Sequence, residues 1–200
     1  MAEKVNVIVL KDGPYQLSNV RNLKFDGELQ SVEGDIWLCR CGRSANAPFC
    51  DGSHNGNFDD QCEPRSPKSI HTWEGRTVRT HFNPNTCMHV FKCQPLKALR
   101  AAELAGDDSA ADKILKVVAT CPSGALTAER TDGGPTPVEP EFDAQVEIMR
   151  GGEIRLQCSF DINEPLQERQ RDERATLCRC GLSQSKPWCD GRHKKRTDFR

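Results

Sequence analysis

Three cysteines and one histidine occur twice in this chain, in the same order and with the same spacing. The stretch LCRCGRSANAPFCDGSH begins at Leu38, and LCRCGLSQSKPWCDGRH begins at Leu177 and aligns with it without a gap. Three thiolates and one imidazole suit either zinc or an iron–sulfur cluster, since both bind soft sulfur and nitrogen donors. Each copy therefore predicts a four-ligand metal site, made of Cys39, Cys41, Cys50 and His54 in the first and of Cys178, Cys180, Cys189 and His193 in the second.

The residues between these donors predict a loop that turns back around the metal. Gly42, Pro48 and Gly52 interrupt the first copy, and the second copy has the same residue types at the same places. Glycine and proline favour turns because their backbone angles differ from those of other residues. Asp51 and Asp190 each precede a Gly-x-His sequence, so we expect each to cap a short helix that carries the histidine in its first turn.

Both copies resemble the CDGSH iron–sulfur family, whose pattern is C-x-C-x2-(S/T)-x3-P-x-C-D-G-(S/A/T)-H. Residues 39–54 fit this pattern at every position, and residues 178–193 fit it except at Arg192, where the family has a small residue. The resemblance implies that each copy holds a redox-active 2Fe–2S cluster through its three cysteines and its histidine. A zinc knuckle with the same four donors is the alternative.

The chain upstream of each copy repeats in a weaker form. DGPYQLSNVRNLKF at residues 12–25 corresponds to GGEIRLQCSFDINE at residues 151–164, and both stretches have the character of extended strands. This resembles the β-rich cap before the cluster loop in CDGSH proteins, of which those with one motif form homodimers that bring two clusters together. Because this chain has two motifs, we expect its two copies to form a pseudo-twofold pair by themselves, with a homodimer as the competing arrangement.

A third group of cysteines lies between the copies. Cys87, Val90 and Cys93 stand where a C-x2-C-x2-C ligand run would stand, and Cys121, followed by proline, stands where the remote ligand would be. This segment resembles a divergent single-cluster ferredoxin domain. Because valine cannot bind iron, three cysteines favour a 3Fe–4S cluster. The alternative, a 4Fe–4S cluster, needs a fourth ligand such as His89, water or another cysteine.

The elements that must position these residues suggest an α+β fold with three modules. Alternation over residues 73–82 predicts a strand, and apolar residues at helical spacing predict helices over residues 96–106 and 108–120. The stretches CEPRSPKS and TDGGPTPVEPE are rich in proline or glycine and indicate linkers. We therefore expect two small β-rich CDGSH modules that flank a ferredoxin-like α+β module, with boundaries at residues 1–65, 66–130 and 131–200.

Composition narrows the classes of protein further. The formal net charge is −1 without a long basic stripe, which argues against a nucleic-acid partner, and MAEKVNVIVL is too short and polar for a signal-peptide core. No apolar run is long enough to cross a bilayer, so we expect a cytoplasmic protein. There, eleven cysteines favour metal or redox chemistry over disulfides. Cys62 and Cys158 match no motif and are expected to be small buried side chains, and His71 and His81 to be ordinary polar residues.

The function that best fits these patterns is one-electron transfer, with two 2Fe–2S clusters and one 3Fe–4S or 4Fe–4S cluster in one chain. No nucleophile-and-base arrangement and no glycine-rich phosphate loop indicates an enzyme. The partners would be a redox protein donor and a redox protein acceptor. The alternatives are a carrier of iron–sulfur clusters, a redox or pH sensor, and an electron-transfer subunit of a larger oxidoreductase.

Overall fold

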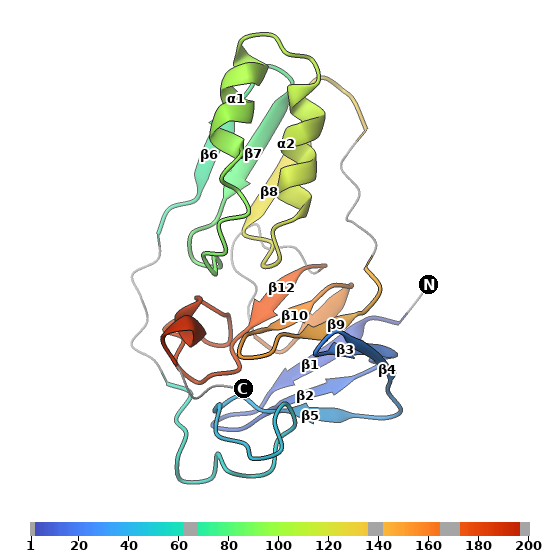
Figure 1. Ribbon diagram of the computed structural model, residues 1–200, viewed down its shortest axis with the longest axis vertical. Helices are drawn as coiled ribbons and strands as arrows, with labels where there is room; N and C mark the ends of the chain where they lie inside the picture. Colours follow the sequence, from blue (N-terminus) through green and yellow to red (C-terminus); the bar gives the residue numbers. More distant parts are fainter. Residues whose placement is uncertain (1–2, 62–67, 136–141, 165–172, 197–200) are drawn as a thin grey trace.

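The computed structural model describes residues 3–61, 68–135, 142–164 and 173–196. The protein is α+β, as the sequence predicts. A body of strands built from both CDGSH copies lies at one end, and a smaller part with two helices and three strands lies at the other (Figure 1). No helix in these ranges has both the length and the apolar character needed to span a bilayer.

The body of strands contains two sheets, and each draws strands from both copies. The first sheet has the order β11-β1-β2-β5, in which β1 (Val5–Val9), β2 (Tyr15–Ser18) and β5 (Ile36–Leu38) come from the first copy and β11 (Phe160–Ile162) comes from the second. The second sheet has the order β12-β10-β9-β3-β4, in which β9 (Val146–Ile148), β10 (Ile154–Leu156) and β12 (Ala175–Leu177) come from the second copy and β3 (Asn22–Phe25) and β4 (Glu28–Ser31) come from the first.

The two copies exchange equivalent strands. Strand β11 pairs in parallel with β1, with Val5 opposite Phe160, and β3 pairs in parallel with β9, with Leu23 opposite Val146. The constant offset between the copies carries β3 onto the region of β11 and β1 onto that of β9. The predicted pseudo-twofold pair therefore forms within one chain.

One hydrophobic core joins the two copies. Side chains along β1 alternate between buried and half-buried, because a strand with one face against a core buries every second residue. Leu17 and Leu23 from the first copy meet Ile148 and Phe160 from the second in this core. Neither copy would bury its apolar strand faces without the other.

The ligand loops of the two copies cross at the backbone. Cys41 and Cys180 form an antiparallel β-bridge, and Gly42 and Gly181 follow them with φ angles of 71° and 77°. A Cβ at Gly42 would lie 2.8 Å from the carbonyl oxygen of Cys180, and a Cβ at Gly181 would lie 2.8 Å from that of Cys41. Both positions need glycine, because the backbone is left-handed and the other loop leaves no space for a side chain.

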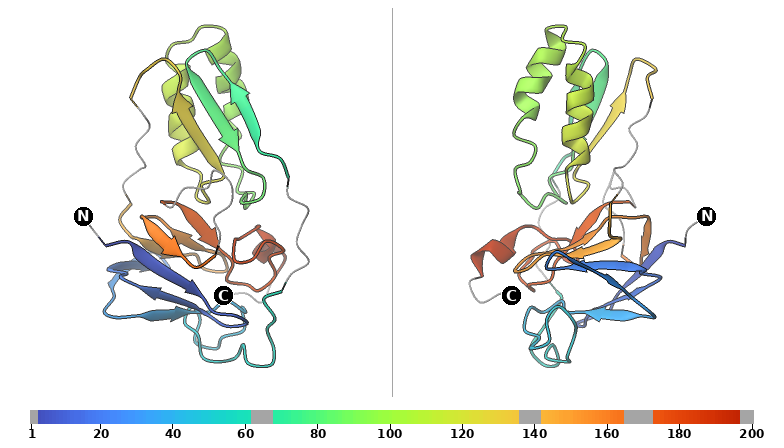
Figure 2. Two further views of the ribbon diagram at one scale, coloured as in Figure 1. Left: turned by 180° about the vertical axis from the view of Figure 1, so that it is seen from behind. Right: turned by 45° about the vertical axis from the view of Figure 1, so that its right-hand side comes forward.

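The central module is a three-stranded antiparallel sheet with two helices on one face (Figure 2). Its elements are β6 (His71–Glu74), β7 (Val78–Phe82), α1 (Leu96–Leu104), α2 (Ala110–Ala119) and β8 (Leu126–Arg130). Val78, Ile114 and Leu126 belong to its own core, which is separate from that of the strand body. The two predicted helices are confirmed, each ending a residue or two before the predicted end.

Residues 73–82, predicted as one strand, instead belong to a hairpin of two strands. The prediction was wrong because a turn separates the two strands. The chain turns at Gly75, whose amide donates to the carbonyl of Val78 at 2.9 Å. The carboxylate of Glu103 stabilises the turn, because it accepts hydrogen bonds from the amides of Arg76 and Thr77 at 2.9 and 2.7 Å. The sequence still alternates as in a strand, because both arms of the hairpin are extended.

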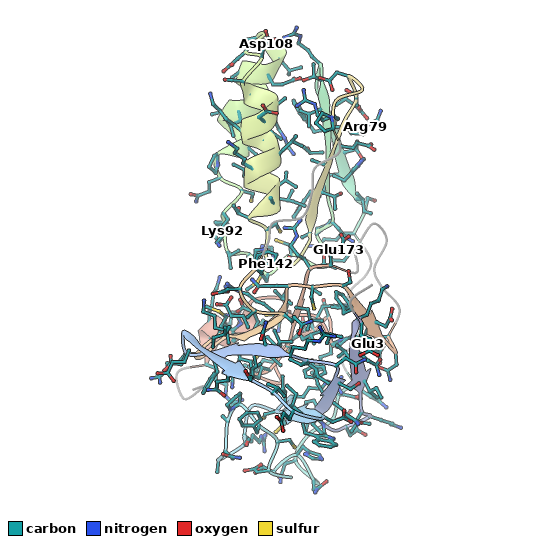
Figure 3. All side chains as sticks on the ribbon, turned by 90° about the vertical axis from the view of Figure 1, so that its right-hand side faces the viewer. Glu3, Arg79, Lys92, Asp108, Phe142 and Glu173 are labelled. Carbon is teal, nitrogen blue, oxygen red and sulfur yellow. The ribbon has the colours of Figure 1, made fainter. Side chains whose placement is uncertain are left out.

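The loop with two of the central cysteines faces the strand body. Lys92, which belongs to this loop, lies at the end of the central module next to the strands, and Asp108 lies at the opposite end (Figure 3). Cys62 and most of the two predicted linkers, residues 62–67 and 136–141, lie outside the described residues. The predicted module boundaries stay predictions.

Candidate metal centres

The four donors of each CDGSH copy lie in two pairs. In the first copy, Sγ of Cys39 is 3.7 Å from Sγ of Cys41, and Sγ of Cys50 is 3.3 Å from Nδ1 of His54. The corresponding distances in the second copy are 3.8 and 3.5 Å. Two thiolates bound tetrahedrally to one metal at about 2.3 Å lie roughly 3.8 Å apart, and a thiolate and an imidazole lie slightly closer. Each pair therefore has the spacing of two ligands on one metal atom.

The two pairs of a copy are too far apart to share a single metal ion. Among the described residues, no three of the four donors of either copy lie within 4.8 Å of one another. One tetrahedral ion would need all four donors within roughly 4 Å of one another. The donor set of each copy therefore fits two metal atoms better than one.

Backbone and serine hydrogen bonds hold the ligand loops in the same way in both copies. The amide of Cys39 donates to the carbonyl of Pro48 at 2.8 Å, and the amide of Cys178 donates to that of Pro187 at 2.7 Å. The serine after each Cys-x-Cys sequence donates its hydroxyl to the carbonyl just before the third cysteine, at 2.6 Å in both copies. The loop that the glycine and proline positions predict therefore forms twice with one geometry.

The aspartate of each Asp-Gly-x-His sequence ties the ligand loop together. Asp51 accepts hydrogen bonds from two backbone amides, at 2.8 and 3.0 Å, and Asp190 accepts two equivalent ones. The hydrogen bonds of Asp51, chiefly from Ser53, lower its pKa to about 2.

The prediction of two aspartate-capped helices was wrong. The first copy has only turns here, and the short 3-10 helix η1 (Arg192–Lys195) of the second has Gly191 as its N-cap.

The two copies differ in how much of the donor set reaches the surface. In the second copy all four donors are buried, with His193 the most exposed at 8%. In the first copy Cys50 and His54 are half-buried. Burial lowers the pKa of His193, which favours the neutral imidazole that binds metal. The second site is therefore internal, and the first site has an edge at the surface.

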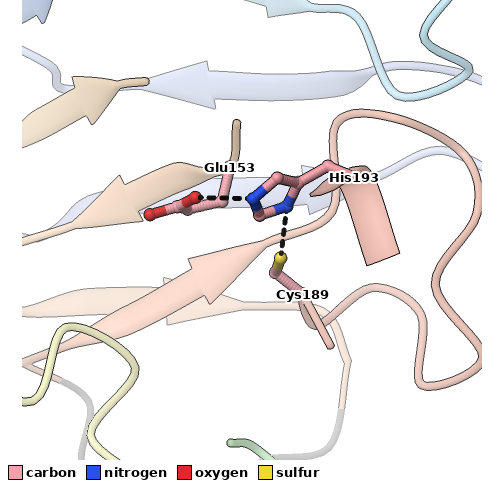
Figure 4. A group of neighbouring side chains, drawn as sticks. All are labelled: Glu153, Cys189 and His193. Carbon is pink, nitrogen blue, oxygen red and sulfur yellow. Dashed lines mark hydrogen bonds and ion pairs between the residues drawn. The ribbon is translucent and has the colours of Figure 1, made fainter. Parts of the chain in front are cut away.

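A buried carboxylate faces the histidine of the second copy. Nε2 of His193 lies 3.7 Å from a carboxylate oxygen of Glu153, while Nδ1 faces Sγ of Cys189 (Figure 4). Glu153 is 3% exposed and also accepts a hydrogen bond of 2.8 Å from Arg155. Sequence reasoning missed this residue, although the alignment of the copies places a charged Glu153 opposite Pro14 and so contains the signal.

Backbone amides point at the cysteine sulfurs of the second copy. The amide of Leu182 lies 3.5 Å from Sγ of Cys180, and the amide of Gly191 lies 3.4 Å from Sγ of Cys189. A hydrogen bond from the Cys180 side chain and several amides lower the pKa of Cys178, whereas burial raises that of Cys189. Hydrogen bonds to ligand sulfur stabilise negative charge there and so tune the redox behaviour of a bound cluster.

The three central cysteines line one cavity together with His89. Cys87, His89 and Cys93 come from the loop before α1, and Cys121 follows α2. Nδ1 of His89 lies 3.7 Å from Sγ of Cys87, and burial raises the pKa of Cys87, as do the thiols of Cys121 and Cys93. Val90 lines the same cavity. Among the described residues, no three of these four donors lie within 4.8 Å of one another, so they fit a cluster better than a single ion.

The cysteine and the two histidines without a motif each contact neighbouring side chains. Cys158 packs partly buried against the main core, and burial raises its pKa to about 11. His81 is buried with a 2.9 Å hydrogen bond to Thr72, and His71 stacks on an aromatic ring of the neighbouring strand.

These loops and donor sets define a protein with iron–sulfur-binding domains. The family model described as iron-binding zinc finger, CDGSH type, matches residues 12–55 and 134–194, which is more than half of the chain, and the chain belongs to this family. The model described as a divergent 4Fe-4S mono-cluster matches residues 73–131 between them. No curated protein and no solved structure matches the chain.

Proposed function

We propose that this protein serves in one-electron transfer and holds three iron–sulfur clusters. A bound cluster of this kind accepts and releases one electron. The observation that carries the proposal is that the ligand loops meet within one chain, since Cys41 and Cys180 are paired through their backbones. Short separations between redox sites serve electron transfer. The donor and the acceptor are proposed to be redox proteins, and the protein is proposed to act as a monomer and not as an enzyme.

Each CDGSH copy is proposed to hold a 2Fe–2S cluster through its three cysteines and its histidine. The support is the pairing of the donors, because each pair suits one iron atom and the two pairs are too distant for one zinc ion. Backbone amides and the loop serines orient these donors. In the second copy, the carboxylate of Glu153 attracts the Nε2–H of His193 and so leaves Nδ1 for the metal.

The central site is proposed to hold a 4Fe–4S cluster, with Cys87, Cys93 and Cys121 as ligands and His89 as the fourth. The support is that His89 lines the same cavity as the three cysteines, and the name of the family that matches this segment. The 3Fe–4S cluster with three thiolates, which Val90 favours from the sequence, is the competing outcome.

Release of a cluster to other proteins is a second candidate function, confined to the first site. Cys50 and His54 are half-buried there, so a proton or an acceptor thiol can reach them. The buried donors of the second site do not allow such access without opening of the core. The alternatives of a sensor or of a subunit in a larger oxidoreductase have no observation that favours them over electron transfer.

Two measurements on the full chain test the proposal. Iron and acid-labile sulfide should amount to about eight atoms each with a 4Fe–4S centre, and about seven irons would indicate a 3Fe–4S centre. Stopped-flow reduction by a ferredoxin reductase is then compared with the rate of cluster transfer to an apo-ferredoxin. Zinc in place of iron would refute the proposal. Cluster transfer to the apo-ferredoxin, without reduction by the reductase, would favour the carrier function.

A further inference from the structure

The loop that holds the central site touches the ligand loop of the second CDGSH copy directly. A Cβ at Gly191 would lie 2.4 Å from the carbonyl oxygen of Met88. Met88 lies between Cys87 and His89 in the chain, and Gly191 lies between the last two donors of the second copy. The two metal-binding loops are therefore in backbone contact, without a side chain between them at this point.

A lysine of the second copy adds a hydrogen bond across the same contact. Nζ of Lys194 donates to the carbonyl oxygen of His89 at 2.8 Å. Lys194 follows His193, and His89 lines the cavity of the central site. The contact thus joins residues adjacent to donors on both sides.

An arginine of the second copy holds the remaining cysteine of the central site. Arg174 lies just before β12, is 2% exposed, and donates from Nη1 to the carbonyl oxygens of Ala119 and Cys121 at 2.9 and 2.6 Å. A cation at the C-terminal end of a helix stabilises it, because the last carbonyl groups lack partners within the helix. The second copy therefore holds both segments that supply the central cysteines.

Among the residues that the structure describes, the first copy has no equivalent of this contact. The positions that correspond to Arg174, Gly191 and Lys194 are Asp35, Gly52 and Asn55. A Cβ at Gly52 would meet nothing closer than the side-chain nitrogen of Asn55 at 3.7 Å. The first copy instead contacts the second through the backbones of Cys41 and Cys180. The three sites are therefore arranged in the order central, second, first.

We propose that the second CDGSH site is the internal junction of the protein, coupled to the central site through the contact of Met88, Gly191 and Lys194. This inference rests on the proposed electron-transfer function and adds the order of the sites. In each transfer one electron leaves one site, which is oxidised, and enters the next, which is reduced, while no proton or bond moves. External one-electron donors and acceptors reach the central site or the half-buried His54 edge of the first site, not the second site.

A matched pair of glycine variants tests the junction in the full chain loaded with iron and sulfide. Gly191 and Gly52 both have left-handed φ angles, 79° and 87°, so alanine strains both loops in the same way. Only Gly191→Ala pushes against the central module. We expect Gly191→Ala, and not Gly52→Ala, to remove the spin–spin broadening between the central and second-site EPR signals of the reduced protein. With photoreduced flavin as the donor, electron exchange between the central and second sites should be severalfold slower in Gly191→Ala, while the second site still accepts electrons from the first site.

Lys194→Ala, with Asn55→Ala as its control, repeats the test without backbone strain. If Gly191→Ala loses iron, Lys194→Ala becomes the decisive variant. Weaker spin–spin broadening in Lys194→Ala, at unchanged iron content, supports the junction. Wild-type broadening and reduction rates in Lys194→Ala, together with equal behaviour of the two glycine variants when both keep iron, would overturn it. A wild-type protein whose clusters cannot be reduced would instead refute the proposed function itself.

Discussion

Replacing Glu153 with glutamine is expected to weaken metal retention at the second CDGSH site and to leave the first site unchanged. The buried carboxylate lies 3.7 Å from Nε2 of His193, so it orients the ring with Nδ1 toward the metal position. Loss of such an outer partner typically costs 10–100-fold in metal affinity. Because 3.7 Å is longer than a hydrogen bond of about 3 Å, we expect the lower end, roughly tenfold or about 1.4 kcal/mol.

The assay is the rate of iron loss to a chelator, followed by visible absorbance and by the EPR signals of the two sites. At a pH of about 7.5, His193 is neutral with either residue, because burial lowers its pKa below the ordinary value of about 6.5. The negative charge of Glu153 raises the pKa of His193 and so partly offsets the effect of burial. Glutamine therefore lowers the pKa of His193 further, so protons compete less for the ring, and the difference from wild type should shrink as the pH falls toward about 5.5.

Glu147→Gln is the matched control. Glu147 and Glu153 both pair with Arg155, at 3.2 and 2.8 Å, but the described contacts of Glu147 do not include His193. The control therefore reports the loss of a carboxylate beside Arg155 alone. Equal rates of iron loss in Glu153→Gln, Glu147→Gln and wild type would refute the reasoning, and so would equal acceleration at both CDGSH sites.

Three further predictions concern the other sites. His54→Cys should slow the loss of absorbance at a pH of about 5.5 and lower the reduction potential of the first site, since thiolate replaces a protonatable neutral donor; unchanged decay would contradict this. His89→Ala should convert the central site to a three-iron centre by EPR and iron content, and Val90→Cys in that background should restore four irons; no change in His89→Ala would make the three-thiolate cluster correct. Gly42→Ala should lower the melting temperature more than Gly34→Ala. Both glycines have left-handed φ angles, where alanine costs roughly 1–2 kcal/mol of stability, but only at Gly42 would the added Cβ also crowd the backbone of Cys180. Equal melting temperatures of the two variants would count against the crossing of the loops.

The candidate donors could be found from the sequence because they depend on local spacing. The repeated Cys-x-Cys and Asp-Gly-x-His sequences fold into loops held by hydrogen bonds between near neighbours, such as the amide of Cys39 with the carbonyl of Pro48. The two central helices were also predictable, since their apolar residues recur at the helical period. The pseudo-twofold pairing followed from the offset between the copies, which keeps equivalent strands in equivalent places.

The differences between the two copies were decided only by the tertiary structure. The two motifs are nearly identical, so they do not indicate which parts of the chain pack against each of them. Those contacts join residues 27 or more positions apart in the sequence and depend on how the sheets and the central module come together. The exchange of β3 and β11 brings both copies around one core. Glu153 then faces His193 from a neighbouring strand end, and the central module packs on Gly191 but not on Gly52. These long-range contacts bury one site and leave the edge of the other exposed, although their donors are the same.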